Sequence, residues 1–203
     1  MNIEIIYIHK INYLWPHNYP AITRVSQNMK TIYIVEQHFG RADWEQEWSD
    51  WYNGNLDVLL GVPGFRTAQR FRCHTEKGDT PRYLAMYTLD SPAVFQTEVY
   101  IKADGNGANS ARFRPAYQLW TRNLYDDPSN AVNVPLGQFL LVEDVTDAST
   151  PLRAGAKRLT CTGMHKTFAY RDLTVLTAPP ATVPANAICY RTLTDQRTQL
   201  YKD

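Results

Sequence analysis

The order of the elements predicted between residues 31 and 125 restricts the fold more than any other feature of this chain. Runs rich in β-branched and aromatic residues indicate strands, and apolar spacing of three and four residues indicates helices. In order, the predicted elements are a strand over 31–36, a helix over 43–60, strands over 65–73 and 82–89, a helix from Ser91-Pro92 and a strand over 117–125. The chain therefore follows the order β-α-β-β-α-β.

The first predicted helix carries an aromatic stripe. Asp43 is a good N-cap with Gln46 as its capping-box partner, and the stretch Gly61–Gly64, which contains Pro63, ends the helix. Its large apolar side chains recur at three- and four-residue steps: Trp44, Trp48, Trp51, Tyr52, Leu56 and Leu59. We expect this stripe to pack on a sheet rather than to form an aromatic cofactor site.

This order of elements is that of the ferredoxin-like fold, an α+β arrangement in which both helices cover one face of an antiparallel sheet. The other face of the sheet is left open and must be buried against a partner. A second repeat in the same chain would close an internal pseudo-dimer, and a second copy of the chain would give a homodimer. We expect the homodimer.

The pattern restarts in the second half of the chain. Residues 127–136 are polar, contain two prolines and are expected to form a linker. Beyond them we expect a strand over 138–143 and a short helix over 151–159, whereas 166–171 and 188–195 echo the second and third strands. Because the sequence stops before a second helix and a fourth strand, the second ferredoxin-like repeat is predicted to be degenerate.

The predicted organisation therefore has four parts. They are an N-terminal extension over 1–28, which precedes a natural start at Met29, a first repeat over 29–126, the linker over 127–136 and a degenerate repeat over 137–203.

Composition excludes several classes of partner. Twenty-one Lys and Arg against twenty Asp and Glu leave a formal charge of +1 with no basic runs, so no nucleic-acid partner is expected. No apolar run is long enough for a membrane span or a signal peptide. The three cysteines are widely separated and lack C-x-x-C spacing, which favours the reducing cytosol over a disulfide framework or a thiolate metal site.

One segment resembles a known superfamily. The stretch Trp51–Phe65, with its Trp-Tyr pair and terminal Val-Pro-Gly-Phe, is similar to the hallmark of the dimeric α+β barrel superfamily, and 70–72, 83–92 and 120–125 fit the same pattern. The resemblance implies antiparallel sheets that pair into a barrel. That superfamily includes cofactor-free monooxygenases, isomerases and dehydratases. Many relatives place a histidine shortly after the Trp-Tyr pair, where this chain has Gly54 and Asn55.

Glu36 and His38 are the candidate catalytic residues. They stand two apart on the first strand and would share one side of it, where they could act as an acid-base pair. The alternative is a histidine exposed to solvent at the end of the strand.

Five residues are candidate ligand-binding groups: Asn55, Arg70, Arg72, Tyr87 and Trp120. The arginines could hold an anionic or phenolic ligand through charge-assisted hydrogen bonds and stacking. The alternatives are a helix-to-strand hydrogen bond for Asn55, a polar rim for the arginines and an interface position for Trp120. The histidines lack the spacing of metal ligands, so neither a metal nor a cofactor is expected.

Two functions fit these features. The first is a cofactor-free enzyme of the monooxygenase, isomerase or dehydratase type that acts on a small hydrophobic or aromatic compound. The second is a non-catalytic ligand-binding or assembly module whose Gly54 and Asn55 record a lost active site.

Overall fold

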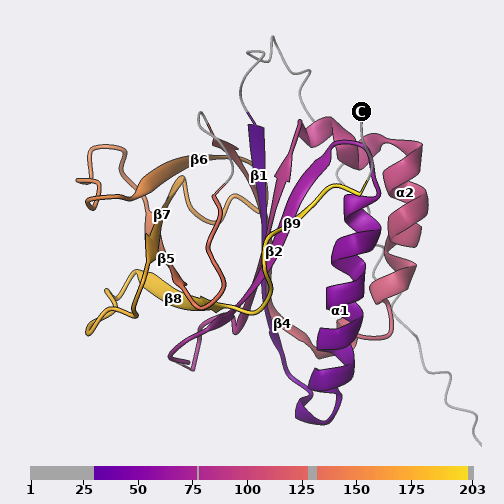
Figure 1. Ribbon diagram of the computed structural model, residues 1–203, viewed down its shortest axis with the longest axis horizontal. Helices are drawn as coiled ribbons and strands as arrows, with labels where there is room; N and C mark the ends of the chain where they lie inside the picture. Colours follow the sequence, from indigo (N-terminus) through magenta and orange to yellow (C-terminus); the bar gives the residue numbers. More distant parts are fainter. Residues whose placement is uncertain (1–29, 77, 128–131, 201–203) are drawn as a thin grey trace, which may run out of the picture.

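The structure, a computed structural model, describes residues 30–76, 78–127 and 132–200 (Figure 1). The predicted extension over 1–28 lies outside the described residues. The strands are β1 (Lys30–Phe39), β2 (Phe65–Cys73), β3 (Tyr83–Leu89), β4 (Tyr117–Asp127), β5 (Phe139–Val145), β6 (Lys157–Met164), β7 (Tyr170–Leu176), β8 (Ala187–Thr192) and β9 (Arg197–Thr198). The helices are α1 (Glu45–Leu60) and α2 (Glu98–Asp104), with 3₁₀ helices η1 (Ala42–Trp44), η2 (Pro92–Gln96), η3 (Gly105–Ser110) and η4 (Arg114–Ala116).

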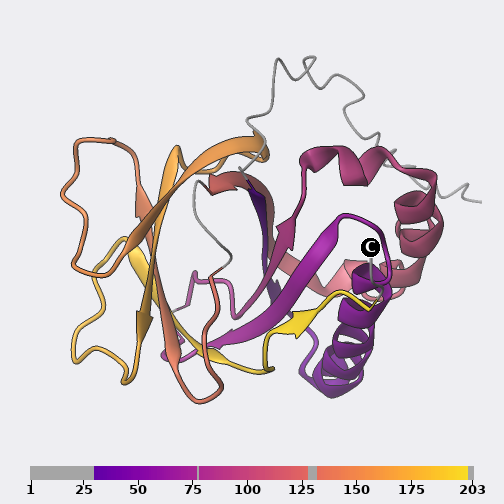
Figure 2. The same cartoon turned by 45° about the horizontal axis from the view of Figure 1, so that its top comes forward.

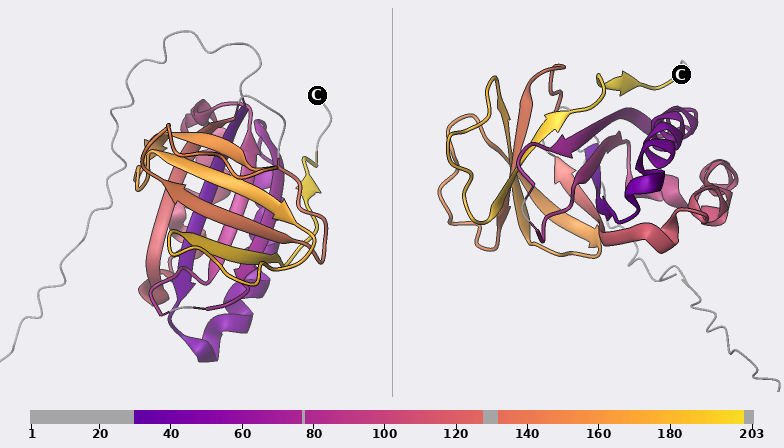
Figure 3. Two further views of the ribbon diagram at one scale, coloured as in Figure 1. Left: turned by 90° about the vertical axis from the view of Figure 1, so that its left-hand side faces the viewer. Right: turned by 90° about the horizontal axis from the view of Figure 1, so that it is seen from below.

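Eight strands close into one antiparallel barrel. Hydrogen-bonded neighbours follow the order β3-β1-β4-β6-β7-β5-β8-β2, and β2 pairs with β3 to complete the circle. β9 adds to β2 beside the end of β8. The open sheet face of the first half is therefore buried within the same chain. Figure 3 shows the strands of the second half lying across those of the first.

The first half has the predicted order of elements. Its strands lie in the order β4-β1-β3-β2, and α1 and α2 lie together on the side away from β5–β8 (Figures 1 and 2). Ser91 caps η2, since its side chain accepts a hydrogen bond from the backbone N–H of Ala93. The second helical segment is thus a 3₁₀ helix followed by the short α2.

Alternation along β1 separates two cores. Tyr33 and Val35 belong to the core beneath the helices, whereas Ile32 and Ile34 belong to the core inside the barrel. Successive side chains of a strand point to opposite faces, so this single strand contributes to both. Glu36 continues the barrel side and is buried.

The aromatic stripe of α1 packs on the sheet as predicted. Trp48, Tyr52 and Leu56 are buried, and the ring of Trp48 stacks on Phe39 with centroids 4.8 Å apart. Full burial of each such side chain contributes roughly 1.5–3 kcal/mol. The predicted N-cap is wrong: η1 precedes the helix, the capping position falls at Trp44 and Asp43 pairs with Arg41 instead.

The second half contributes the four strands β5–β8 to the barrel, carries the short β9 after them and has no helix among its described residues. Its strands lie in the order β8-β5-β7-β6. The helix predicted over 151–159 is wrong, because β6 begins at Lys157 and pairs with β7, which buries Leu159 inside the barrel. The expectation that the chain ends before a fourth strand is also wrong, since β8 supplies it.

Two long loops connect the strands of the second half. Residues 146–156 connect β5 to β6, and 177–186 connect β7 to β8. Outside the barrel these segments leave only a small apolar cluster around Leu141, Ala187 and Cys189, which includes Val183 from the second loop. None of the described helices has both the length and the apolar character needed to cross a membrane.

Candidate functional site

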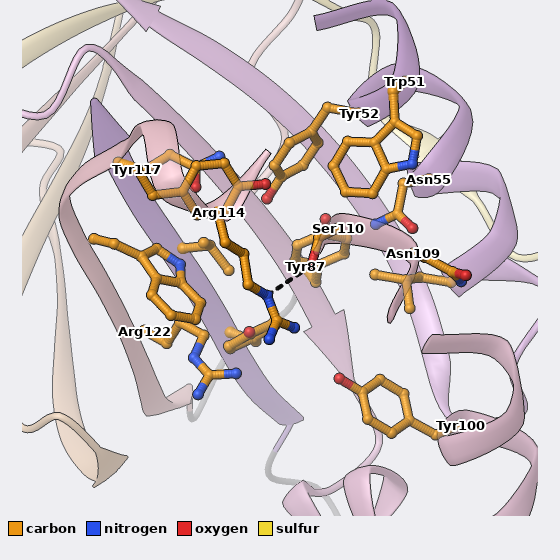
Figure 4. A pocket seen from close by; sticks show the side chains of 15 residues that line it. Trp51, Tyr52, Asn55, Tyr87, Tyr100, Asn109, Ser110, Arg114, Tyr117 and Arg122 are labelled. Carbon is orange, nitrogen blue, oxygen red and sulfur yellow. Dashed lines mark hydrogen bonds between the residues drawn. The ribbon is translucent and has the colours of Figure 1, made fainter. Parts of the chain in front are cut away.

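A cavity of about 90 Å³ lies between α1 and the sheet, and we call it the sheet–helix cavity (Figure 4). Aromatic side chains from three elements form much of its wall: Trp51 and Tyr52 from α1, Tyr87 from β3, and Tyr117 and Trp120 from β4. A cavity of this size suits a ligand of about one aromatic ring, whose faces these side chains can contact.

The polar groups of the sheet–helix cavity are amides, phenols and guanidiniums. Asn55 projects from α1 beside Trp51, while Arg114 and Arg122 approach from the opposite side (Figure 4). Among the described residues, no carboxylate and no histidine lines this cavity. The wall therefore carries positive charge and hydrogen-bond donors, which suits an anionic oxygen on a ligand.

The two guanidiniums are held in place by neighbours. Arg114 donates from Nε to Ser110 Oγ at 3.1 Å, the contact drawn as a dashed line in Figure 4. The guanidinium of Arg122 lies over the ring of Trp120, 4.7 Å from its centroid. Both contacts limit the rotation of long side chains and leave the charge at the cavity wall.

The buried phenols act as neutral groups. Burial raises the pKa of Tyr52 and that of Tyr87 well above the ordinary value of a phenol. Burial also raises the pKa of Tyr117, which accepts a hydrogen bond from Trp48 Nε1 at 3.3 Å. These tyrosines keep their protons near neutral pH, so they can donate hydrogen bonds but supply no base.

Three predicted ligand-binding residues meet in this cavity. Asn55, Tyr87 and Trp120 come from α1, β3 and β4 and all line it. Gly54, the other residue that replaces the histidine segment of relatives, faces solvent, and a Cβ built there meets nothing within 4 Å. Only position 55 could therefore present a side chain to a ligand.

Arg70 lies beneath α1 rather than in the cavity wall. It is 1% exposed and donates from Nη1 to the Ser49 carbonyl oxygen at 2.8 Å and to Asn53 Oδ1 at 2.7 Å. Its guanidinium also lies over the ring of Tyr52, 4.5 Å from the centroid. Arg70 thus fixes α1 on the sheet and supports Tyr52, which does line the cavity.

Arg72, Glu36 and His38 also lie away from the sheet–helix cavity. Arg72 stacks on Tyr83 and pairs with Glu76. Glu36 points into the barrel, and the half-buried His38 lies opposite Gln118, past a bulge in the pairing of β1 with β4. Nothing in the structure joins Glu36 and His38, and their acid-base role stays a prediction.

The sequence reasoning missed the two cavity arginines. Arg122 stands two residues after Trp120 on one strand, so the period of two placed it on the same face, and this signal could have been used. Arg114 precedes β4 in a short 3₁₀ helix, and no local pattern indicates where its side chain points. Trp51 and Tyr52 were assigned to core packing alone, although they also form the cavity wall.

Comparison with known proteins gives structural relatives only. No protein-family model and no curated protein matches the sequence. An anthrone oxidase-like protein of known structure matches at a TM-score of 0.53 and 10% identity, covering 87% of this chain and 95% of that one. A protein of Lactobacillus acidophilus NCFM, described as a "putative monooxygenase", matches at 0.50 and 10% identity, covering 84% and 97%. The chain therefore shares the fold of these two solved structures.

Proposed function

We propose that this chain is a cofactor-free enzyme of the monooxygenase, isomerase or dehydratase type that acts on a small phenolic or other aromatic compound. The observation that carries the proposal is the composition of the sheet–helix cavity, in which aromatic walls surround two guanidiniums and three amides. The anthrone oxidase-like neighbour supports an aromatic substrate, and the neighbour described as a monooxygenase supports the type of reaction.

The chemistry begins with binding of the ligand in its anionic form. A ring packs against Trp51 and Trp120, and its phenolate or enolate oxygen accepts hydrogen bonds from Arg114, Arg122 or Asn55. Each charge-assisted hydrogen bond contributes roughly 1.5–3 kcal/mol, which favours the ionised ligand. Because the tyrosines in the wall stay protonated, the proton leaves to water.

An oxygenase reaction then draws its electrons from the substrate. At a ring CH₂ that is acidified by an adjacent carbonyl, the enolate reduces O₂. One oxygen atom forms a new C=O bond at that carbon, and the other leaves as water with the two hydrogens. The residues of this chain bind and orient the enolate and stabilise its negative oxygen.

The test compares two arginines that stand two residues apart. Arg114→Met removes a guanidinium from the cavity wall, while Arg112→Met removes an exposed one that pairs with Glu47. Oxygen consumption and product formation are measured with a panel of phenols and cyclic aryl ketones. Arg114→Met is expected to lower kcat/KM by about 10-fold or more, and Arg112→Met to leave it unchanged. Equal effects of the two variants would contradict the proposal.

The alternative function is a binding module without catalysis. The absence of a carboxylate or histidine from the described wall favours it, because such groups usually perform general acid-base steps. Binding of phenolates that depends on Arg114, with neither oxygen consumption nor conversion of any compound, would support the module over the enzyme.

We also propose that the second half of the chain is a degenerate ferredoxin-like repeat. In each half the first strand lies between the third and the fourth, and the second strand lies outside the third. The two loops of 146–156 and 177–186 stand where such a repeat would have its helices. In this proposal the linker spans 127–136 and the degenerate repeat spans 137–203.

Homodimerisation and a cytosolic location remain predictions. The apolar face that motivated a dimer is covered by β5–β8 of the same chain, so a dimer would need another surface. Sedimentation analysis of the full chain tests the prediction, and a compact monomer at all concentrations would refute it.

A further inference from the structure

A second cavity opens at one mouth of the barrel, on the other side of β1. Its volume is about 640 Å³, within the range of roughly 300–1,000 Å³ typical of small-molecule sites. The turn before β3, the start of β4 and the loops that follow β5, β6 and β7 surround it. We call it the barrel-mouth cavity, and it shares no lining residue with the sheet–helix cavity.

Carboxylates dominate the charge of the barrel-mouth cavity. Glu36, Asp79 and Asp144 line it, and Arg171 is the single Lys or Arg among its lining residues. Arg171 donates from Nη1 to Glu36 Oε2 at 2.6 Å, and its Nη2 lies 2.6 Å from Asp144 Oδ1. Its charge is thus already shared between two carboxylates, so the cavity keeps negative charge and an anionic ligand would be repelled.

Asp144 is the carboxylate best placed to meet a ligand. Glu36 is buried, and its second oxygen accepts a hydrogen bond from Tyr190 Oη at 3.0 Å. The side chain of Asp144 is 20% exposed, and both of its contacts with Arg171 involve Oδ1. Oδ2 therefore has capacity to accept a hydrogen bond from a ligand.

The remaining wall of the barrel-mouth cavity is largely apolar. Phe168 from the β6–β7 turn, Leu119 at the start of β4 and Ile188 on β8 all line it. Leu119 is 45% exposed and offers apolar area to a ligand. Phe168 is half-buried, and the guanidinium of Arg171 lies over its ring, 5.9 Å from the centroid, so Phe168 contributes apolar area to the wall.

We propose that the barrel-mouth cavity binds a small organic amine in its ammonium form. The ammonium group lies beside Asp144 and donates a hydrogen bond to Oδ2, while the apolar body of the ligand packs on Phe168, Leu119 and Ile188. Among the residues that the structure describes, no group of three His, Cys, Asp or Glu side chains could hold a metal ion. The cation that this cavity fits is therefore organic.

The pKa of Asp144 adds a condition to this binding. Burial raises it to about 6, Arg171 opposes the shift, and the nearby negative charge of Glu36 adds to it. The charged or ionisable groups that interact with this carboxyl are Arg171 on β7, Glu36 on β1 and Tyr125 on β4. Amine binding should weaken as the pH falls through 6, because the carboxylate becomes protonated.

The test is a calorimetric titration of the full chain with three probes of similar shape: phenethylamine, 2-phenylethanol and 3-phenylpropionate. At pH 7.5 the amine is expected to bind about 10-fold tighter than the alcohol, and the carboxylate not at all. Equal affinity for amine and alcohol, or preference for the carboxylate, would overturn the proposal.

Two variants locate the site. Asp144→Asn should remove the preference for the amine, whereas Asp147→Asn, which changes an exposed carboxyl in the loop that follows β5 and lies outside the cavity wall, should keep it. If Asp144→Asn does not fold, titration of the unchanged chain at pH 5 replaces it and should show the same loss. An amine preference that survives at pH 5 would overturn the proposal.

Discussion

The two faces of the first sheet each bury one arginine, and the side chains that surround its charge differ between the faces. Inside the barrel, Arg171 lies between two carboxylates, and their attraction raises its pKa despite its burial. Beneath α1, Arg70 has no carboxylate partner; it lies among the rings of Trp48, Tyr52 and Tyr83, and burial lowers its pKa.

This difference extends to the cavities on the two faces. The sheet–helix cavity has guanidiniums without carboxylates, and the barrel-mouth cavity has carboxylates that exceed its single guanidinium. One strand therefore separates a site suited to anions from a site suited to cations. The comparison teaches that alternation along a strand can divide function as well as packing.

The largest effect is expected from Arg171→Leu. Removing this side chain leaves Glu36 and Asp144 close together and unpaired, which typically costs about 3–5 kcal/mol. Urea unfolding of the variant measures the loss. Arg153→Leu is the control, because Arg153 is half-exposed and pairs with Glu143 at the surface, where the expected loss is under about 1 kcal/mol. Similar losses in the free energy of unfolding for the two variants would show that the ion pairs of Arg171 contribute no more to stability than a surface ion pair.

Arg70→Leu should cost less than Arg171→Leu. The substitution also removes a buried charge that no carboxylate neutralises, and this gain offsets part of the lost hydrogen bonds to Ser49 and Asn53. We expect a loss of about 1–2 kcal/mol in the free energy of unfolding. If Arg70→Leu unfolds the protein more readily than Arg171→Leu, the contrast between the two faces is wrong.

The sequence predicted the first half of the chain well for a physical reason. Each of its helices carries local signals, such as the stripe of Trp48 and Tyr52 and the Ser91 cap, and these agree with the packing. In the second half, local sequence signals do not agree with the packing in this way. The stretch 151–159 has no strong strand pattern, and pairing with β4 and β7 makes Lys157 onward a strand.

The candidate site was predictable in part. Asn55, Tyr87 and Trp120 lie on a helix and strands whose periodicity is clear in the sequence. The predicted fold therefore places their side chains together between the helix and the sheet. The sequence offers Glu36 and His38 as a candidate acid-base pair, and it gives no sign that Glu36 contacts Arg171 and Tyr190, which are more than 130 residues away in the sequence. Contacts of this kind depend on barrel closure, which no local pattern encodes.

The barrel side should also show a distinctive pH dependence. The pKa of Asp144 is raised from 3.8 to about 6 in the folded chain, so the folded state binds its proton more tightly than the unfolded state. Stability from this group is fully present below pH 3.8 and is lost as the pH rises through 6. Unfolding measured from pH 4 to 7 in the native chain and in Asp144→Asn isolates the effect. Identical pH profiles would contradict it.

The smallest effect on stability is expected from Asn55→His. Position 55 is half-buried at the cavity wall, so the change should alter the free energy of unfolding by less than about 1 kcal/mol. It gives the sheet–helix cavity a group that titrates near pH 6.5. Turnover of phenols and aryl ketones should then follow the ionisation of this histidine. A pH profile that matches the native chain would show that position 55 does not face the substrate.

The most direct test of the sheet–helix cavity is fluorescence titration of the native chain with 4-nitrophenol, a phenol that ionises near neutral pH. Quenching of the tryptophans, which include Trp51 and Trp120 in the wall, reports binding. The account predicts that affinity rises as the pH is raised through the ionisation of the ligand, and that Arg114→Met abolishes this rise while Arg112→Met keeps it. The account would be contradicted if the affinity fell on ionisation of the phenol, or if the affinity rose with pH in Arg114→Met as it does in the native chain.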